Sequence, residues 1–310
     1  MKQIFIIRAA GNELANQLWN CASVYAYALE RGYRLVNPAF FEYSEYFTMR
    51  SSPSRLFRLL FAKPFKDYTK RKFSLKRRIW RKLYSWYAGW QLWRFGNDVI
   101  ASPATDPYYL PPSAAPDAKL ASLEKRSKTV PLDGWLFRNP TGLEKHRTAI
   151  RSYIQPRPDI QASIDRQISE IRSRFDRVIG IHIRQGDYKT WRGGAYFLDQ
   201  RRVREVIDEY ISKFSVNTDR ACFFIASDGR VDEKLFEGLH IVVSANNAVT
   251  DLFLLSRTDA ILGSNSTFGA FASYIGDIPL IVMKKEPMDW NYYADKKRYF
   301  QNKYCEMVHF

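Results

Sequence analysis

The sequence predicts an α/β protein built on doubly wound parallel sheets, and three observations support this prediction. Strand-like apolar runs alternate with amphipathic helical runs through the second half of the chain, as they do where crossover helices join parallel strands. The chain also opens with a strand, a loop and a helix. Its 310 residues, 46% of them hydrophobic, are enough for one large α/β unit or for two domains.

The first half of the chain contains this strand–loop–helix opening, followed by less regular sequence. Residues 2–8 are predicted as a buried strand. Residues 14–31 are predicted as a helix that ends at Gly32, because glycine adopts the left-handed backbone that closes many helices. The remaining predictions for this half are a second strand, an irregular aromatic stretch and a loop rich in Pro, Ala, Ser and Asp, at residues 33–36, 38–49 and 101–116.

A stretch that contains two prolines divides the chain. Pro156 and Pro158 lie between two helical patterns, and the residue before a proline disfavours helical backbone. We therefore predict a domain boundary here, which gives domains of residues 1–155 and 156–310. Strands are predicted at residues 178–184, 221–227, 240–244, 260–264 and 279–283, and helices at 140–154, 159–175, 199–214, 231–238, 251–259 and 266–276.

Composition excludes several classes of protein. The apolar content excludes a disordered or collagen-like chain. Cys21, Cys222 and Cys305 are scattered and form no C-x-x-C pair, so we expect no disulfide framework, no zinc site and a reducing compartment. No window approaches the uninterrupted run of about 18 apolar residues that a membrane-spanning helix requires, and we expect no export signal. These features predict a cytoplasmic protein.

Much of the positive charge is concentrated in one segment. The chain has 48 basic and 32 acidic residues, a formal net charge of +16, which predicts an anionic partner. Between Lys63 and Arg94 there are eleven basic residues and one acid. Within this basic aromatic segment, about residues 63–96, apolar side chains recur in the three- and four-residue steps of one helix face: Leu75, Ile79, Leu83, Tyr87, Trp90 and Trp93.

The basic aromatic segment has more than one interpretation. A basic helix with an apolar, aromatic flank can lie in the headgroup region of an anionic membrane, which would place the protein on the inner face of that membrane. Alternatively, the helix packs on the core and keeps a solvated basic face. A third interpretation is contact with an acidic acceptor or with nucleic acid; we expect no nucleic-acid partner.

Polar side chains follow one strand of the second half in a pattern that suits phosphate. Ligands of doubly wound sheets bind at the carboxyl ends of strands. His182 and Arg184 lie on the same side of an extended chain at such an end. The planar guanidinium of Arg184 can bind a diphosphate with two hydrogen bonds. The alternative is a surface ion pair between Arg184 and a neighbouring aspartate that contributes little stability.

Three other strand ends carry candidate residues. Asp228 either accepts hydrogen bonds from a sugar hydroxyl or base amine, or caps the helix that follows. Residues 264–268 open a helix, where they either bind an anion or form a plain N-cap. Glu13, Asn16 and Gln17 lie at the start of the first helix and are unremarkable by themselves.

Taken together, three motifs resemble those of a known family. Residues 182–188, HIRQGDY, are similar to the H-x-R-R-G-D-Y signature of the alpha-1,2-fucosyltransferases, a form of the H-x-R-x-x-D pattern shared with alpha-1,6- and protein-O-fucosyltransferases. Residues 14–19, LANQLW, resemble their L-G-N-Q-L-F element, and residues 251–268 resemble their third element. The resemblance covers residues 4–36 and 177–283.

The resemblance implies a GT-B glycosyltransferase with two facing Rossmann-like domains, in which the carboxyl-terminal domain holds GDP-fucose and no metal or other cofactor is required. L-Fucose would move, with inversion, to a hydroxyl of an oligosaccharide or lipid-linked glycan acceptor, in an alpha-1,2 linkage, during synthesis of a surface polysaccharide or glycolipid. Arg184 would clamp the β-phosphate and offset the charge of the leaving group, while His182 and Asp187 position it.

The resemblance also implies the remaining site residues. Inversion requires a base beside the acceptor hydroxyl, for which Glu13 and Asp187 are candidates and Glu13 is preferred. The residues expected to bind donor or substrate are Asn16, Gln17, Asp228, Asp251, Ser264, Asn265, Ser266, Thr267 and Phe268.

Two departures from the family pattern leave alternatives open. Gln185 stands where the signature has its second arginine, and Ala15 where the amino-terminal element has glycine. A different nucleotide sugar or a different linkage would be compatible with the same fold. An alternative from another class is a membrane- or nucleic-acid-associated binding protein whose nucleotide site is vestigial.

Overall fold

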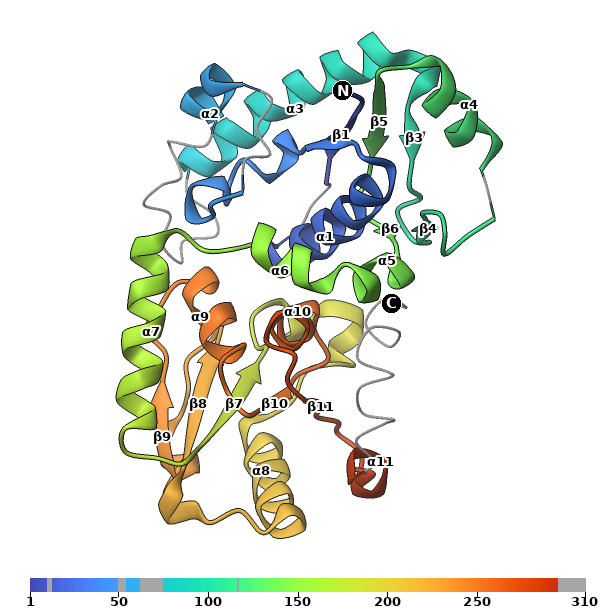
Figure 1. The fold of residues 1–310 in the computed structure, drawn as a ribbon. Coiled ribbons are helices and arrows are strands. Elements are labelled where there is room, and N and C mark those ends of the chain that lie inside the picture. The colour runs from blue at the N-terminus through green and yellow to red at the C-terminus, as the bar shows by residue number, and fades with distance from the viewer. Residues whose placement is uncertain (10–12, 50–53, 62–74, 116, 295–310) are drawn as a thin grey trace. The chain divides into compact units, whose positions relative to one another are not determined.

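Each half of the chain is organised around a parallel sheet (Figure 1). This computed structural model divides into two compact units, Met1–Pro158 and Asp159–Phe310. It describes residues 1–9, 13–49, 54–61, 75–115 and 117–294. Residues 63–74 of the basic aromatic segment and Cys305 therefore lie outside the described residues.

The sheet of the first unit has the strand order β2-β1-β5-β3, and all neighbouring strands are parallel. Its strands are β1 (Gln3–Arg8), β2 (Arg34–Val36), β3 (Ile100–Ala101) and β5 (Thr129–Asp133). The predicted strands over residues 2–8 and 33–36 are thus confirmed. Strand β5 has no clear signal in the sequence, because Pro131 interrupts its apolar pattern and proline is uncommon inside a sheet.

Helix α1 (Leu14–Arg31) has the predicted bounds. Gly32 follows it with a left-handed φ of 63°, and its N–H bonds back to the carbonyls of Ala28 and Leu29, so glycine ends the helix for the expected reason. The middle of α1 is buried on all sides, because every residue from Gln17 to Val24 is buried.

The other elements of the first unit surround this core. The predicted helix over residues 140–154 is instead two helices, because His146 adopts a non-helical conformation between them. The irregular stretch 38–49 contains two short 3-10 helices. The elements are α2 (Arg55–Phe61), α3 (Leu75–Phe95), β4 (Tyr108–Tyr109), α4 (Ala118–Arg126), β6 (Phe137–Arg138), α5 (Pro140–Lys145) and α6 (Arg147–Tyr153).

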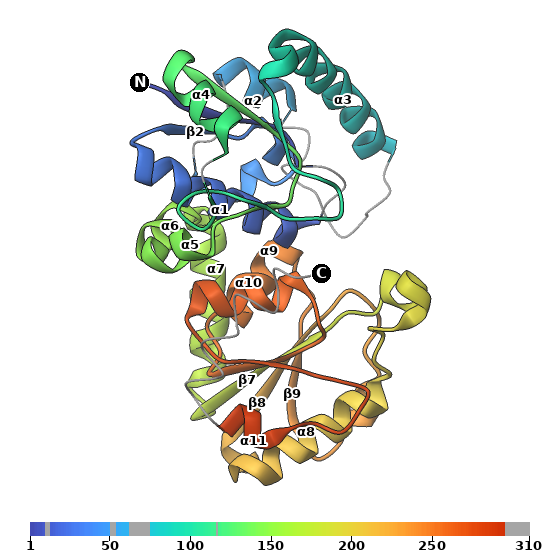
Figure 2. The same cartoon turned by 90° about the vertical axis from the view of Figure 1, so that its right-hand side faces the viewer.

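The sheet of the second unit has the strand order β11-β10-β7-β8-β9, again with parallel neighbours. Helices α9 and α10 cover one face of this sheet, and α8 and α11 cover the other (Figure 2), as expected for a doubly wound sheet. The elements are α7 (Pro158–Arg172), β7 (Arg177–Ile183), α8 (Gln200–Phe214), β8 (Ala221–Ser227), β9 (His240–Val243), α9 (Ala248–Leu255), β10 (Ala260–Gly263), α10 (Thr267–Gly276), β11 (Leu280–Val282) and α11 (Trp290–Ala294).

Three predicted helices of this unit differ in extent from the structure. The helix predicted over residues 251–259 is α9, Ala248–Leu255, which Asn247 caps, and the one predicted over 159–175 ends at Arg172. The helix predicted over residues 231–238 is largely absent. Residues 231–238 contain only a 3-10 helix, Glu233–Phe236, with Asp232 as its N-cap. The stretch is short and polar at its start, so it satisfies its backbone groups with a single tight turn.

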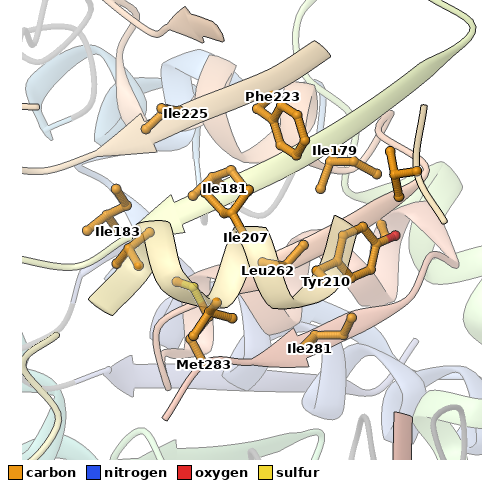
Figure 3. Close-up of a cluster of buried hydrophobic side chains, with 14 of the residues drawn as sticks. Ile179, Ile181, Ile183, Ile207, Tyr210, Phe223, Ile225, Leu262, Ile281 and Met283 are labelled. Carbon is orange, nitrogen blue, oxygen red and sulfur yellow. The ribbon is translucent and has the colours of Figure 1, made fainter. Parts of the chain in front are cut away.

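Strand β7 carries the main core of the second unit and also positions the candidate site. Figure 3 shows Ile179, Ile181 and Ile183 pointing toward α8, where they pack with Phe223 and Ile207 in a fully buried cluster. Burial stabilises each of these side chains by about 1.5–3 kcal/mol relative to exposure. Since side chains alternate along a strand, the intervening residues of β7 face α9 and α10 instead.

None of the helices described here combines the length and the apolarity that crossing a bilayer requires.

Candidate functional site

Arg184 directly follows β7, and two carboxylates hold its side chain. Its Nε donates to an oxygen of Asp187 at 3.0 Å, its Nη2 lies 2.9 Å from the same oxygen, and its Nη1 lies 3.2 Å from an oxygen of Asp228. The guanidinium carbon also lies 5.7 Å from the centre of the Tyr188 ring. The side chain is 16% exposed, so Arg184 is a preorganised, partly buried cation rather than a loose surface pair.

Asp228 connects the loop after β8 to the loop after β7. One of its oxygens accepts from the backbone N–H groups of Gln185, at 2.6 Å, and Gly186, at 3.1 Å. A Cβ atom on Gly186 would lie 2.7 Å from the other oxygen, so a larger residue here would displace the Asp228 carboxylate. The alternative that Asp228 caps the following helix is wrong, because Asp232 occupies the cap.

His182 lies on the opposite face of β7 from the isoleucine cluster and contacts α10. Its ring stacks on Phe268 with a centroid distance of 5.0 Å. Burial, and secondarily the charge of Arg184, lowers the pKa of His182 to about 4, although Asp228 opposes the shift. The imidazole is therefore neutral at neutral pH. Its Nδ1 atom is buried without a hydrogen-bond partner among the described residues.

The loop before α10 lies beside Arg184. The hydroxyl of Ser264 accepts from the backbone N–H of Arg184 at 3.0 Å, and the Tyr188 hydroxyl donates to the carbonyl of Asn265 at 2.7 Å. Ser266 is the N-cap of α10, which begins at Thr267, and accepts from the N–H of Phe268. The predicted N-cap is thus present, and it places the positive end of the helix dipole next to the arginine.

The other predicted residues lie elsewhere. Asp251 is buried in the first turn of α9, where it accepts a hydrogen bond from the hydroxyl of Ser244 after β9. Glu13 is the exposed N-cap residue of α1, and its side chain makes no capping hydrogen bond. Asn16 and Gln17 lie in the first turn of α1, half-buried and buried. Glu13, Asn16 and Gln17 belong to the first unit, and their predicted roles stay predictions.

A pocket of about 710 Å³ adjoins the Arg184 loop. Three basic side chains and one acid line it together with polar groups: Lys189, Arg230 and Lys234, then Asp232, then Gln185, Gly186, Gln200 and Gly229. Gln185 donates to the Ser227 hydroxyl and the Arg230 carbonyl, at 3.3 and 3.2 Å. No sequence pattern predicts this pocket, because its charges come from separate loops and show no regular spacing.

Tyr188 is a further residue that the sequence analysis quoted in a motif but did not select. Its ring supports the Arg184 guanidinium and its hydroxyl connects the two loops. Its position in the HIRQGDY motif was the available signal. Among the described residues, no three His, Cys, Asp or Glu side chains are grouped as metal ligands would be.

Comparison with known proteins gives a likeness in structure only. No protein-family profile and no curated protein matches the sequence. A GDP complex of a variant of Arabidopsis thaliana FUT1 aligns with 93% of this chain and 71% of its own, with 14% identity and a TM-score of 0.52. NodZ alpha-1,6-fucosyltransferase crystallised with GDP aligns over 91% and 95%, with 16% identity and a TM-score of 0.50.

A third solved structure, POFUT1 in complex with GDP, aligns over 91% of this chain and 98% of its own, with 14% identity and a TM-score of 0.52. At such identities the likeness establishes the fold. The predicted GT-B-like α/β architecture with parallel sheets is therefore confirmed, and the chain shares it with these three fucosyltransferase structures.

Proposed function

We propose that this chain is an inverting glycosyltransferase that moves L-fucose from GDP-fucose to a hydroxyl group of a glycan acceptor. The observation that carries the proposal is the arrangement of Arg184, which two carboxylates hold at the carboxyl end of β7 beside the N-terminus of α10. Ligands of doubly wound sheets bind at this edge. The three fucosyltransferase structures with the same fold, each named as a GDP complex, support the choice of nucleotide.

Arg184 retains hydrogen-bonding capacity for a diphosphate. A guanidinium has five N–H groups, and three of them are directed at Asp187 and Asp228. One N–H on each Nη therefore remains. When the bond between the fucose anomeric carbon and the β-phosphate oxygen breaks, negative charge develops on that oxygen, and these groups would stabilise it.

Arg184 alone does not supply enough positive charge to attract a diphosphate. Asp187 and Asp228 outweigh its single positive charge, and His182 is neutral. Attraction of a diphosphate therefore depends on the N-terminus of α10 and on the basic side chains of the adjoining pocket. This arrangement gives the pocket a role in donor binding that no single motif predicts.

The general base is the second requirement of an inverting transfer. Nε and Nη2 of Arg184 both lie within 3.0 Å of the same Asp187 oxygen, which makes Asp187 a positioning residue in this proposal. Glu13, exposed at the start of α1 without a capping bond, is the proposed base. Asn16, Gln17 and Asp251 are proposed as further contacts to substrate.

The linkage and the acceptor are finer proposals. The HIRQGDY motif favours an alpha-1,2 linkage, and the acceptor would be an oligosaccharide or a lipid-linked glycan. Gln185 supports a second candidate, a transferase with the same fold and another nucleotide sugar. Its amide is engaged with Ser227 and Arg230 and adds no charge to the donor site.

The first test is a thermal-shift titration with GDP, GDP-fucose, GDP-mannose, UDP-glucose and ADP, with and without magnesium. A ligand that binds only the folded state raises the melting temperature. We expect GDP and GDP-fucose alone to do so, equally without magnesium. A response confined to UDP-glucose or ADP would replace the donor, and no response to any nucleotide would favour a binding protein with a vestigial site.

The second test removes the arginine. Arg184→Ala should lower the transfer rate at least about a hundredfold, because a charged transition-state contact is lost. Arg220→Ala is the matched control, since Arg220 makes a similar pair with Asp176, at 2.7 and 2.6 Å, on an exposed surface. It should keep its rate within about twofold. An Arg184→Ala protein as active as this control would contradict the mechanism.

A further inference from the structure

Helix α3 has two chemically different faces: polar side chains lie on its buried side, and large apolar side chains lie on its outward side. Figures 1 and 2 both show the helix at the outer edge of the first unit. Its buried residues include two polar ones, Arg77 and Gln91, together with Tyr84 and Ala88. At about 100° per residue these four positions share one side of the helix. The side that packs on the unit is therefore mixed, because Tyr84 stacks on Phe41 with a centroid distance of 4.5 Å while Arg77 and Gln91 are polar.

Specific contacts attach the buried side of α3 to the unit. Arg77 donates to Glu42 at 2.8 Å, and both side chains are almost completely buried. The hydroxyl of Tyr84 donates to the carbonyl of Ile7 at 2.6 Å. Ala88 packs here with no exposed surface. These contacts determine which side of the helix faces outward.

The outward side carries large apolar side chains. Trp86 is 65% exposed, Trp90 50% and Trp93 80%, and Leu75 and Ile79 are also exposed. These five residues, which we call the tryptophan face, lie within an arc of about 60°. Helix α3 therefore packs on the core, as one interpretation expected, but its solvated side carries large aromatic side chains as well as basic ones, and Arg77 is in the core.

Basic side chains flank the tryptophan face. The Lys82 ammonium lies 5.8 Å from the centre of the Trp86 ring, and the Arg94 guanidinium lies 5.7 Å from that of Trp90. Arg78 is exposed on the same part of the helix. The sequence of α3 contains no acid, so these charges are not balanced within the element.

The neighbouring helix has the same character. In α2, Leu56, Leu59 and Leu60 are each at least half exposed, and the sequence of the helix contains two arginines and no acid. Phe57 packs against Tyr87 of α3 with a centroid distance of 5.1 Å. Exposed apolar clusters of this kind mark interaction sites on proteins.

We propose that the tryptophan face of α3 binds the surface of a bilayer that contains anionic lipids. Tryptophan is favoured at the boundary between headgroups and acyl chains, because its ring is apolar and its N–H remains hydrated. Flanking lysine and arginine side chains are attracted to anionic headgroups. A second copy of the chain would bring two unbalanced positive surfaces together, which disfavours a dimer through this face.

This inference does not depend on the proposed transferase activity. Its test measures cosedimentation of the chain, at low salt, with vesicles of phosphatidylcholine mixed with phosphatidylglycerol, compared with vesicles of phosphatidylcholine alone. We expect at least about tenfold tighter binding to the mixed vesicles. Brominated lipid in these vesicles should quench tryptophan fluorescence, because the rings enter the headgroup region.

Two sets of variants separate the contributions of the tryptophans and of the basic side chains to vesicle binding. Trp86→Gln combined with Trp93→Gln should weaken binding at least about tenfold and leave the melting temperature unchanged, since both side chains are exposed. Arg78→Gln combined with Lys82→Gln should weaken it to a similar extent. Its matched control, Lys125→Gln combined with Lys128→Gln, removes two exposed charges of the same unit and should stay within about threefold of wild type.

Three outcomes would overturn the proposal. The first is wild-type protein that does not bind the mixed vesicles. The second is full binding by the tryptophan variant, which would identify a purely electrostatic surface. The third is loss of binding in the control equal to that in the arginine–lysine variant, because net charge and not the face of α3 would then determine binding.

Discussion

Arg184 and His182 show how neighbouring side chains determine the chemistry of a single residue. They are two positions apart at the end of β7, yet one is held as a cation by two carboxylates and the other is kept neutral by burial. A neutral His182 avoids a second charge beside Arg184 and packs flat on Phe268. The guanidinium of Arg184 therefore has a defined direction, which in the proposed function lets it bind a diphosphate alongside the basic side chains of the adjoining pocket.

The lowered pKa of His182 predicts how stability depends on pH. In the unfolded chain the imidazole takes up a proton near pH 6.5, whereas in the folded chain it does so near pH 4. Stability is therefore fully present above about pH 6.5 and is lost progressively as the pH falls toward 4. The free energy of unfolding lost through His182 over this range is about 3 kcal/mol.

Urea unfolding at a series of pH values would check this prediction, with His182→Gln as the comparison. Between pH 4 and 6.5, the free energy of unfolding of the variant should depend less steeply on pH than that of the wild type, because the contribution of His182 is absent. Equal slopes in the two proteins would show that the imidazole accepts its proton in the folded state.

Among the secondary-structure elements, the close packing of α10 on α9 holds the candidate site around Arg184 in place. Helix α10, whose first turn contacts His182, lies against α9. The contact is closest at Gly276, where a Cβ atom would lie 2.2 Å from the backbone carbonyl oxygen of Ser256 at the end of α9. Any larger residue must push the two helices apart, because a backbone carbonyl cannot rotate away.

Gly276→Ala is therefore expected to lower the free energy of unfolding by about 3 kcal/mol. Its control is Gly89→Ala, in α3, where a Cβ atom would meet nothing within 4 Å. The control should raise the free energy of unfolding by about 0.5–1 kcal/mol, because alanine favours the helix. Chemical denaturation of both variants measures the difference, and equal effects would show that the α9–α10 contact tolerates a methyl group.

At the scale of the whole molecule, the two units carry different chemistry. The second holds the Arg184 cluster and its basic pocket, while the first holds the tryptophan face of α3. Donor binding and membrane binding are therefore predicted to be separable properties of one chain.

Hydrogen exchange with and without GDP tests this separation. At a GDP concentration about a hundredfold above its Kd, mass action stabilises the folded state by about 2.7 kcal/mol. We expect slower exchange in residues 184–189 and 264–268 of the second unit, while the amides of α3 exchange unchanged. Protection confined to the first unit would contradict the proposed donor site.

Local patterns were enough to predict most elements of the second unit. Strands β7, β8 and β10 and helices α8 and α10 agree with the predicted ranges to within one residue at each end, because each combines a clear apolar period with a capping or turn residue. The predictions were wrong where local signals are weak, as at residues 231–238 and His146. Strand β5 was missed because its place in the sheet depends on pairing with β1.

The alternation of strands and helices, the order of three motifs and the residues that end several helices can be read from the amino-acid sequence, because these features depend on neighbours along the chain. In contrast, the folded structure was needed to show that Asp228 connects two loops instead of capping a helix, and that the tryptophans of α3 face outward while Arg77 lies in the core. The physical reason is that hydrogen-bond partners and burial depend on residues distant in sequence, such as Glu42 for Arg77.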